Sequence, residues 1–307
     1  MSHEAGAAHD QPAEPVRGAQ APVRPLYWSL RRELWENPSV WAAPAGFAAF
    51  AIAGLVIHAI AMPSHLPGML AFDATGQASA SVMYRYAAVL MQVAAFLIGA
   101  FYCLEALSSE RRDRSILFWK SLPVSDLTTV LAKALVPLAV VPLTAFAATV
   151  AMHVAMLLLS FAALLLHGHG VAVLWNEVQL FRLWGAVLYA MAAVALWHAP
   201  LYGFFLLASG WGKRAAALWV LLPLLALGII EKLTFDSSRV AEAVRYRLVG
   251  WHLEAFQQQL PGVVHLDPMA TPTPGRLLAT PALWLGLVFA AACVAGAVRL
   301  RSRREPG

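Results

Sequence analysis

The sequence predicts an all-α membrane protein that crosses the bilayer several times. Of its 307 residues, 60% are hydrophobic and 13% are charged, and the mean hydropathy is +0.64. Apolar runs of about 20 residues, the length that an α-helix needs to cross the hydrocarbon core, recur along the chain. A soluble protein of this length buries a large core without charge-free runs of that kind.

The basic residues point to the same class. The formal net charge is +5 and the isoelectric point is near 9.5. Lysines and arginines gather at the ends of the apolar runs, where they meet anionic lipid headgroups and set topology. We therefore expect the lipid bilayer, and not nucleic acid, as the partner of this positive charge.

Two segments precede the first apolar run. Residues 1–25 lack the regions of a cleavable signal peptide, and their composition predicts a disordered cytoplasmic tail. Residues 26–35 alternate apolar and charged side chains with helical spacing. This pattern favours a helix in the inner membrane interface, with Arg31 and Arg32 toward lipid phosphates and with Trp28 and Trp35 on the same segment. The alternative is a plain cytoplasmic extension of the first membrane helix.

Residues 26–300 form one membrane domain, followed by a short cytoplasmic tail at 301–307. Asn37-Pro38 and Thr280-Pro281 supply a cap and a first-turn proline for the first and last membrane helices. Six spans are expected, at about residues 40–61, 85–107, 129–160, 183–209, 215–233 and 280–299.

The third apolar run allows two interpretations. Residues 134–176 carry no formal charge when histidine is neutral, and as one helix they would reach roughly 65 Å. Either a long helix kinks at Pro137 and Pro142 and runs past the bilayer, or the stretch contains two spans or a re-entrant part. The positive charges favour one span: with six spans, 15 of the 22 lysines and arginines lie on the inner side. A seventh span would move Lys213 and Arg214 outside, so we expect both termini in the cytoplasm.

The longest outer loop covers residues 235–278. Val240, Val244, Leu248 and Trp251 mark an amphipathic helix within it, and a proline-rich return follows.

No catalytic constellation is visible, and no enzyme activity is expected on this chain. Gly210-Trp211-Gly212-Lys213-Arg214 lacks the spacing and the hydroxyl of a nucleotide-binding loop. Ser160, Ser209 and Thr144 lie in apolar runs without a base in register, so we expect them to bond to helix backbones.

Histidines and cysteines are expected to be structural. His65, His167 and His169 lie in outer loops without cysteine or carboxylate at ligand spacing, which favours hydrated side chains over a metal site. Within the spans, His58, His153 and His198 are expected to make interhelical hydrogen bonds. Cys103 and Cys293 lie in apolar runs and predict no disulfide. No cofactor is expected on this chain.

A charged inner loop at residues 110–126 is the densest cluster of charge between the apolar runs. It combines charged and apolar side chains that would be an aggregation liability unless a partner covered them. The predicted contact residues are Glu110, Arg111, Arg112, Arg114, Leu117, Trp119, Lys120 and Pro123. The alternative is a solvated loop whose aromatic residues dip into the membrane interface.

This loop resembles the one that joins the second and third helices in ABC-2 type exporter permeases. Glu110-Arg111, Ile116-Leu117, Leu122-Pro123-Val124-Ser125 and Lys133 occupy the places of the family pattern, whereas Asp113-Arg114-Ser115 departs from it. The resemblance implies a permease subunit of an ATP-binding cassette exporter in a bacterial inner membrane. It also implies a second permease, as homodimer or heterodimer, and a separate ATPase subunit that binds ATP and Mg.

Lys133 lies about two turns into the third span if Ser125 or Asp126 caps that helix. From there its ammonium reaches the inner surface or a carboxylate such as Glu105 or Glu110. We expect it to fasten the inner loop to the third helix, and the alternative is a charge that only sets topology. An almost uncharged midplane argues against an ion-coupled secondary transporter. A membrane anchor or assembly factor without transport activity stays open.

Overall fold

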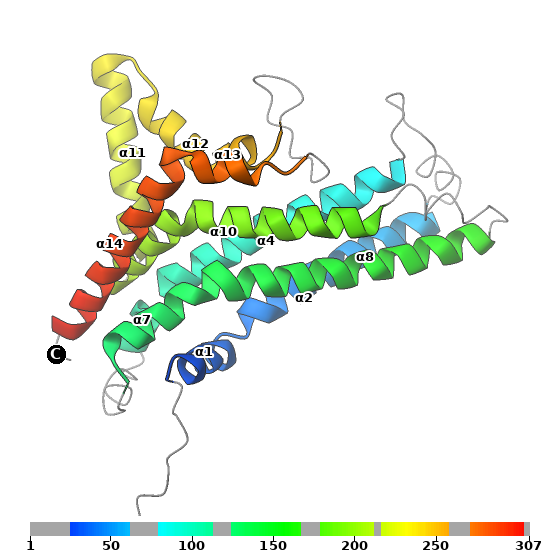
Figure 1. Ribbon diagram of the computed structural model, residues 1–307, viewed down its shortest axis with the longest axis horizontal. Coiled ribbons are helices and arrows are strands. Elements are labelled where there is room, and N and C mark those ends of the chain that lie inside the picture. The colour runs from blue at the N-terminus through cyan, green and yellow to red at the C-terminus, as the bar shows by residue number, and fades with distance from the viewer. Residues whose placement is uncertain are drawn as a thin grey trace, which may run out of the picture.

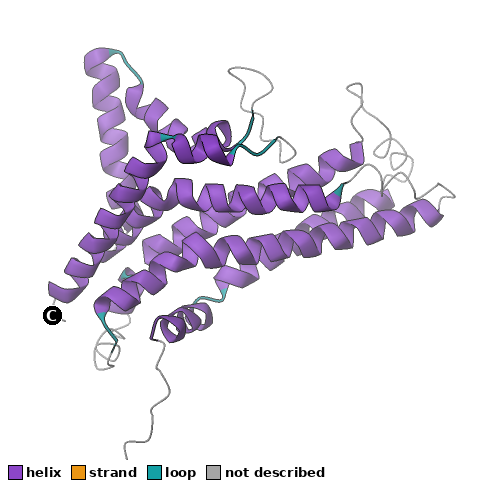
Figure 2. Cartoon of the chain, viewed as in Figure 1, coloured by secondary structure: helices purple, strands orange, loops and turns teal. Residues whose placement is uncertain are grey.

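The computed structural model describes residues 25–61, 79–112, 124–166, 179–211, 216–257 and 271–303, which are almost entirely helical (Figure 2). An isolated bridge between Phe256 and Pro272 is the β-type pairing found there. In chain order the elements are α1 (Pro25–Glu36), α2 (Ser39–Ala61), α4 (Ser79–Glu105), α5 (Ser108–Arg112), α7 (Asp126–Leu135), the π-helical turn η2 (Val136–Val140), α8 (Val141–Leu166), α10 (Leu180–Trp211), α11 (Ala216–Phe235), α12 (Arg239–Ala255), α13 (Pro274–Ala279) and α14 (Pro281–Arg303).

Five of these stretches are long and apolar enough to cross a membrane, and the chain is a multi-pass membrane protein. They cover Ser39–Ile57, Met83–Glu110, Asp126–Ala162, Leu180–Trp211 and Pro281–Arg303. Each overlaps a predicted span. The remaining predicted span, 215–233, coincides with the 20-residue helix α11, which is not among the five. The count of six and the orientation of the termini stay predictions.

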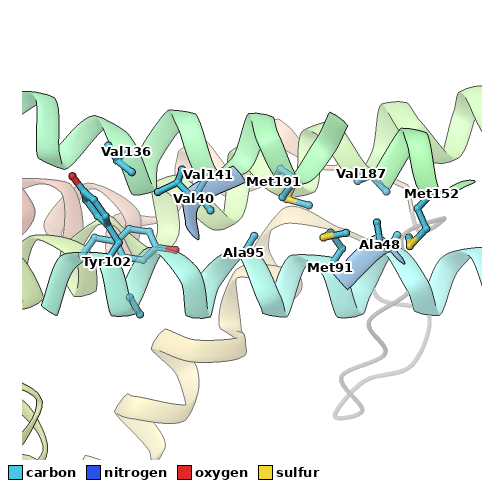
Figure 3. Close-up of a cluster of buried hydrophobic side chains, with 14 of the residues drawn as sticks. Val40, Ala48, Met91, Ala95, Tyr102, Val136, Val141, Met152, Val187 and Met191 are labelled. Carbon is cyan, nitrogen blue, oxygen red and sulfur yellow. The ribbon is translucent and has the colours of Figure 1, made fainter. Parts of the chain in front are cut away.

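Helices α2, α4, α8 and α10 run side by side and enclose the main hydrophobic core (Figure 1). Tyr102 lies at one end of the cluster in Figure 3, and Met91, Met191 and Met152 lie farther along it. Core residues recur along each helix with helical spacing, which leaves the other faces apolar and exposed, as lipid contact requires. Cys103 and Cys293 are buried free thiols within this helical part of the chain.

The third apolar run is one helix through Leu166, so the long-helix interpretation is confirmed for the part that the structure describes. At 1.5 Å per residue the helix from Asp126 to Leu166 is roughly 60 Å long. It widens into a π-helical turn at Val136–Val140, where Pro137 has no N–H to donate to the preceding turn. Pro137 lies within this π-helical turn and Pro142 lies in the first turn of α8, and the kink at these prolines stays a prediction.

Helices α14 and α11 leave the direction of the bundle (Figure 1). α14 packs closely on α10 because Gly203 lets the two backbones approach: a Cβ at this position would lie 3.1 Å from the backbone of Ala290. α11 projects away from the bundle and turns into α12, which coincides with the predicted amphipathic helix. Glu231 near the end of α11 accepts bonds from the backbone N–H groups of Arg239 and Val240, each at 2.7 Å. Trp251 of the predicted apolar face is buried, whereas Leu248 is exposed.

Candidate functional site

Charged side chains from four helices meet at one end of the bundle, where α1, the beginning of α7 and the end of α14 lie near one another (Figure 1). We call this group the charge network. It comprises Arg32 and Glu33 of α1, Tyr102 of α4, Glu110 of α5, Asp126 and Lys133 of α7, and Arg301 of α14.

Lys133 lies at the centre of the charge network and is almost fully buried. Its ammonium lies 2.9 Å from Oε1 and 3.1 Å from Oε2 of Glu33, and 3.1 Å from Oε1 of Glu110. The exposed fractions of the three side chains are 3%, 1% and 5%. Lys133 therefore joins a residue of α1 to the first residue of the predicted inner loop.

Glu33 receives several donors besides Lys133. The Tyr102 hydroxyl donates to its Oε2 at 2.7 Å, and Arg32 Nη2 donates to its Oε1 at 2.9 Å. Asn37 donates to the backbone carbonyl of Glu33 at 3.1 Å, where α1 ends. A carboxylate with this many donors is held in one orientation.

Arg301 connects the two ends of the predicted inner loop. Its Nη1 donates to Oε2 of Glu110, and its Nε donates to Oδ1 of Asp126 at 2.8 Å. Glu110 precedes residues 113–123 and Asp126 follows them. One guanidinium from the last helix thus pairs with carboxylates on both sides of that loop.

Local sequence explains how these side chains reach one place. Ser125 caps α7 by accepting from the backbone N–H of Thr128 at 3.1 Å, which fixes the helix start and sets Lys133 two turns further on. Ser209 of α10 accepts from the N–H groups of Leu107 and Ser108, each at 3.0 Å, at the break between α4 and α5. This break turns the chain, and Glu110 is buried behind it.

The described network balances its charges, with Glu33, Glu110 and Asp126 facing three cations. Arg32 also reaches Glu36 at 3.4 Å, at the more exposed edge, where burial raises the pKa of the Glu36 carboxyl above its usual range. A buried pair gains little net stability, because desolvation offsets most of the attraction, but removing one member leaves a buried uncompensated charge. The network therefore fixes how α1, α5, α7 and α14 are arranged.

Several sequence predictions can be placed against this geometry. Lys133 meets Glu110, one of the two predicted carboxylates, and Glu105 is exposed. The prediction that Arg32 faces lipid phosphates is wrong: its guanidinium turns inward, where it adds an ion pair to each of the buried carboxylates of Glu33 and Glu110. Arg31 is exposed, as are Trp28 and Trp35.

The predicted partner-contact residues divide into three groups. Glu110 is 5% exposed and bonded inside the chain, so little of its carboxylate faces outward. Arg111 and Arg112 continue the backbone of α5. The other predicted contacts lie outside the described residues, namely Arg114, Leu117, Trp119, Lys120 and Pro123.

Polar residues within the spans make the hydrogen bonds expected of them. His153 Nδ1 accepts from Trp184 Nε1 at 3.2 Å, so its Nε2 donates to the Tyr84 carbonyl at 3.0 Å. His198 Nε2 lies 3.1 Å from the Leu248 carbonyl of α12, and the Thr144 hydroxyl donates to backbone carbonyls of its own helix and of α2. The expected interhelical bonding of His153 and His198 is confirmed.

The part of the chain that the structure describes contains no candidate metal site. No three histidine, cysteine or carboxylate side chains come together there in a way that would hold an ion. The outer-loop residues His65, His167 and His169 lie outside that part.

Sequence reasoning missed Glu33, Tyr102 and Arg301 as members of the site. Glu33 shares a helix face with Ser29 and lies opposite Trp28 and Trp35, which is the signal that could have found it. Arg301 lies in a run of basic residues, which is expected at the cytoplasmic end of a span, so nothing marked it as a member of the site.

The charge network joins side chains of α1, α4, α5, α7 and α14. Comparison with known proteins adds no family to this geometry, since no family model, curated protein or solved structure matches the chain.

Proposed function

We propose that this chain is a permease subunit of an ATP-binding cassette exporter, coupling ATP hydrolysis on a separate subunit to substrate movement across a bacterial inner membrane. In this proposal the chain has six spans, both termini are cytoplasmic, α1 lies in the inner interface, and a second permease completes the pathway. The family resemblance of residues 110–133 suggests this function.

The observation that carries the proposal is the pairing of Arg301 with Glu110 and Asp126 on both sides of the inner loop. If a partner displaces this loop, the loop must be rigidly connected to the spans for the displacement to reach them. Arg301 ties it to α14, and Lys133 ties Glu110 and α7 to α1. Closure of an ATPase dimer beneath this loop would therefore move three helices together.

Copurification tests the partner. In Trp119→Ala combined with Arg112→Glu, the ATPase subunit should be lost after mild solubilisation while membrane insertion persists. The matched control is Trp211→Ala combined with Arg303→Glu, an exposed aromatic and a basic residue at the same end but outside the loop. An ATPase that stays bound at wild-type stoichiometry in the loop variant would defeat the proposal.

Lys133→Gln tests the fastening role separately. This variant removes the charge and keeps a polar stem, and Lys133→Arg is the control that keeps the charge. Normal insertion and partner binding, with ATP turnover uncoupled from export, is the expected result. Wild-type export per ATP hydrolysed in the Gln variant would show that Lys133 transmits nothing.

A further inference from the structure

Two neighbouring arginines of α1 have opposite surroundings. Arg32 faces inward and pairs with Glu33, Glu36 and Glu110. Arg31 faces outward, and among the described residues no carboxylate forms an ion pair with it. The helix thus satisfies one guanidinium with acids of its own chain and presents the other to its surroundings.

Two indole rings hold the Arg31 guanidinium. Its Cζ lies 5.3 Å from the ring centroid of Trp28 and 5.4 Å from that of Trp35, which are three residues before it and four after it. Both distances lie within the range of a cation–π contact. A cation–π contact of this kind does not use the N–H donors of the guanidinium, so they stay available for an anion. Since the indoles also limit the side-chain rotamers, the donors are held in place before a ligand binds.

We propose that Trp28, Arg31 and Trp35 form a binding site for the phosphate of an anionic phospholipid. Three features favour lipid over a protein acid. The membrane span of α2 begins at Ser39, close after the end of α1 at Glu36. Indole rings prefer the level of the lipid headgroups. The stacked guanidinium offers the paired donors that match two phosphate oxygens.

This proposal rests on the proposed position of α1 at the membrane surface and does not depend on export. It gives the outward face of α1 a role that complements the inward face. Because Arg32 and Glu33 follow Arg31 directly, a lipid held at Arg31 keeps α1 in the rotation that places Glu33 against Lys133.

Lipid retention by the full-length protein tests the site. The purified chain is exchanged into detergent with equal amounts of phosphatidylglycerol and phosphatidylcholine, and bound lipids are counted by native mass spectrometry. The wild type should prefer phosphatidylglycerol, and Arg31→Gln should lower that preference about fivefold, the effect of one arginine near an anionic surface. Arg31→Lys keeps the charge without the stacking and should fall between them. The matched control is Arg239→Gln, an exposed arginine of α12, which should behave as wild type.

Further measurements distinguish a lipid-binding site at Arg31 from a protein-binding face. Trp28→Leu combined with Trp35→Leu should lower the preference as Arg31→Gln does, which covers the case in which Arg31→Gln does not fold. An unchanged preference for phosphatidylglycerol in folded Arg31→Gln overturns the proposal. So does a loss of a copurifying ATPase in Arg31→Gln with lipid retention intact, because the face would then bind a protein. A lowered lipid preference with normal ATPase binding supports it, whatever the outcome of the loop variants.

Discussion

The charge network surrounds a buried arginine, Arg301, and the contact between α10 and α12 surrounds a partly buried one, Arg247, and the two are satisfied in different ways. Arg301 has carboxylates on two sides. Arg247 of α12 donates to the backbone carbonyls of Trp197 at 3.1 Å and Ala282 at 3.2 Å, and its Cζ lies 5.0 Å from the Trp197 ring. Trp197 Nε1 donates back to the Arg247 carbonyl at 3.0 Å.

This difference indicates which region better tolerates the loss of a charged side chain. Around Arg247, partial burial without a facing carboxylate lowers the pKa of the guanidinium. Its acceptors are backbone carbonyls, so losing the side chain leaves no buried charge behind. In the charge network each cation removed leaves at least one buried carboxylate with less compensation. The first region anchors α12 to α10, and the second joins several helices through charge.

The prediction with the largest expected effect is that the two regions lie on opposite sides of the membrane. In a background without Cys103 and Cys293, single cysteines at Ser79 and Ser238 should label from outside with an impermeant maleimide, and cysteines at Ser108 and Ser302 should not. Ser238 precedes α12 and Ser302 follows Arg301. Outside labelling at Ser302 would mean an odd number of spans, and the six-span topology would fail.

Lys133→Met should produce the largest loss of stability. It leaves Glu33 and Glu110 buried with less compensation, which costs about 3–5 kcal/mol. The measurement is the free energy of unfolding in a fixed detergent. Adding Glu33→Gln should recover part of the loss, because one unpaired charge is removed. A loss below about 1 kcal/mol for Lys133→Met would show that the network is looser than its distances indicate.

Arg301→Gln should have a smaller and local effect. Asp126 is 29% exposed and regains water, so the expected cost is about 1.5–3 kcal/mol. Hydrogen exchange should rise at both ends of the inner loop, in residues 108–112 and 124–130, and not in α12. Arg247→Gln is the matched variant, and it should raise exchange in α12 alone. Spread of either effect into the other region would remove the distinction between them.

The smallest expected difference is the one between the losses of stability when two tyrosine hydroxyls are removed. Tyr102 donates to a carboxylate, and Tyr189 donates to the backbone carbonyl of Ala255 at 3.1 Å. Tyr102→Phe should therefore cost about 1.5–3 kcal/mol and Tyr189→Phe about 0.5–1.5 kcal/mol. Equal losses, measured by chemical unfolding, would mean that the charge on Glu33 does not strengthen its bond to Tyr102.

The predictability of these features follows the distance along the chain that separates interacting residues. Apolar runs and the Ser125 cap are local, so the sequence predicts five of the spans and the start of α7 correctly. The contact between Lys133 and Glu110 can be predicted from the sequence because the two residues lie on either side of one loop. Glu33 and Arg301 come from distant helices, and a run of basic residues looks the same whether it faces lipid or a buried carboxylate. Arg32 pairs with Glu33 and Glu36 of its own helix and with the distant Glu110, and only the contact with Glu110 could not be predicted from α1 alone.

The π-helical turn at Val136–Val140 has a consequence for how insertions and deletions would act on this chain. Such a turn holds one residue more than the α-helical turn it replaces, and each residue of an α-helix adds about 100° of rotation. Because the extra residue lies within a wider turn, deleting it would restore regular helix and keep α7 and α8 in nearly the same relative rotation. A deletion in the regular part of α8 would instead rotate α7 by about 100° relative to the rest of the bundle and carry Lys133 away from Glu33 and Glu110. The π-helical turn is therefore the place in this long helix where a change of length disturbs the charge network least.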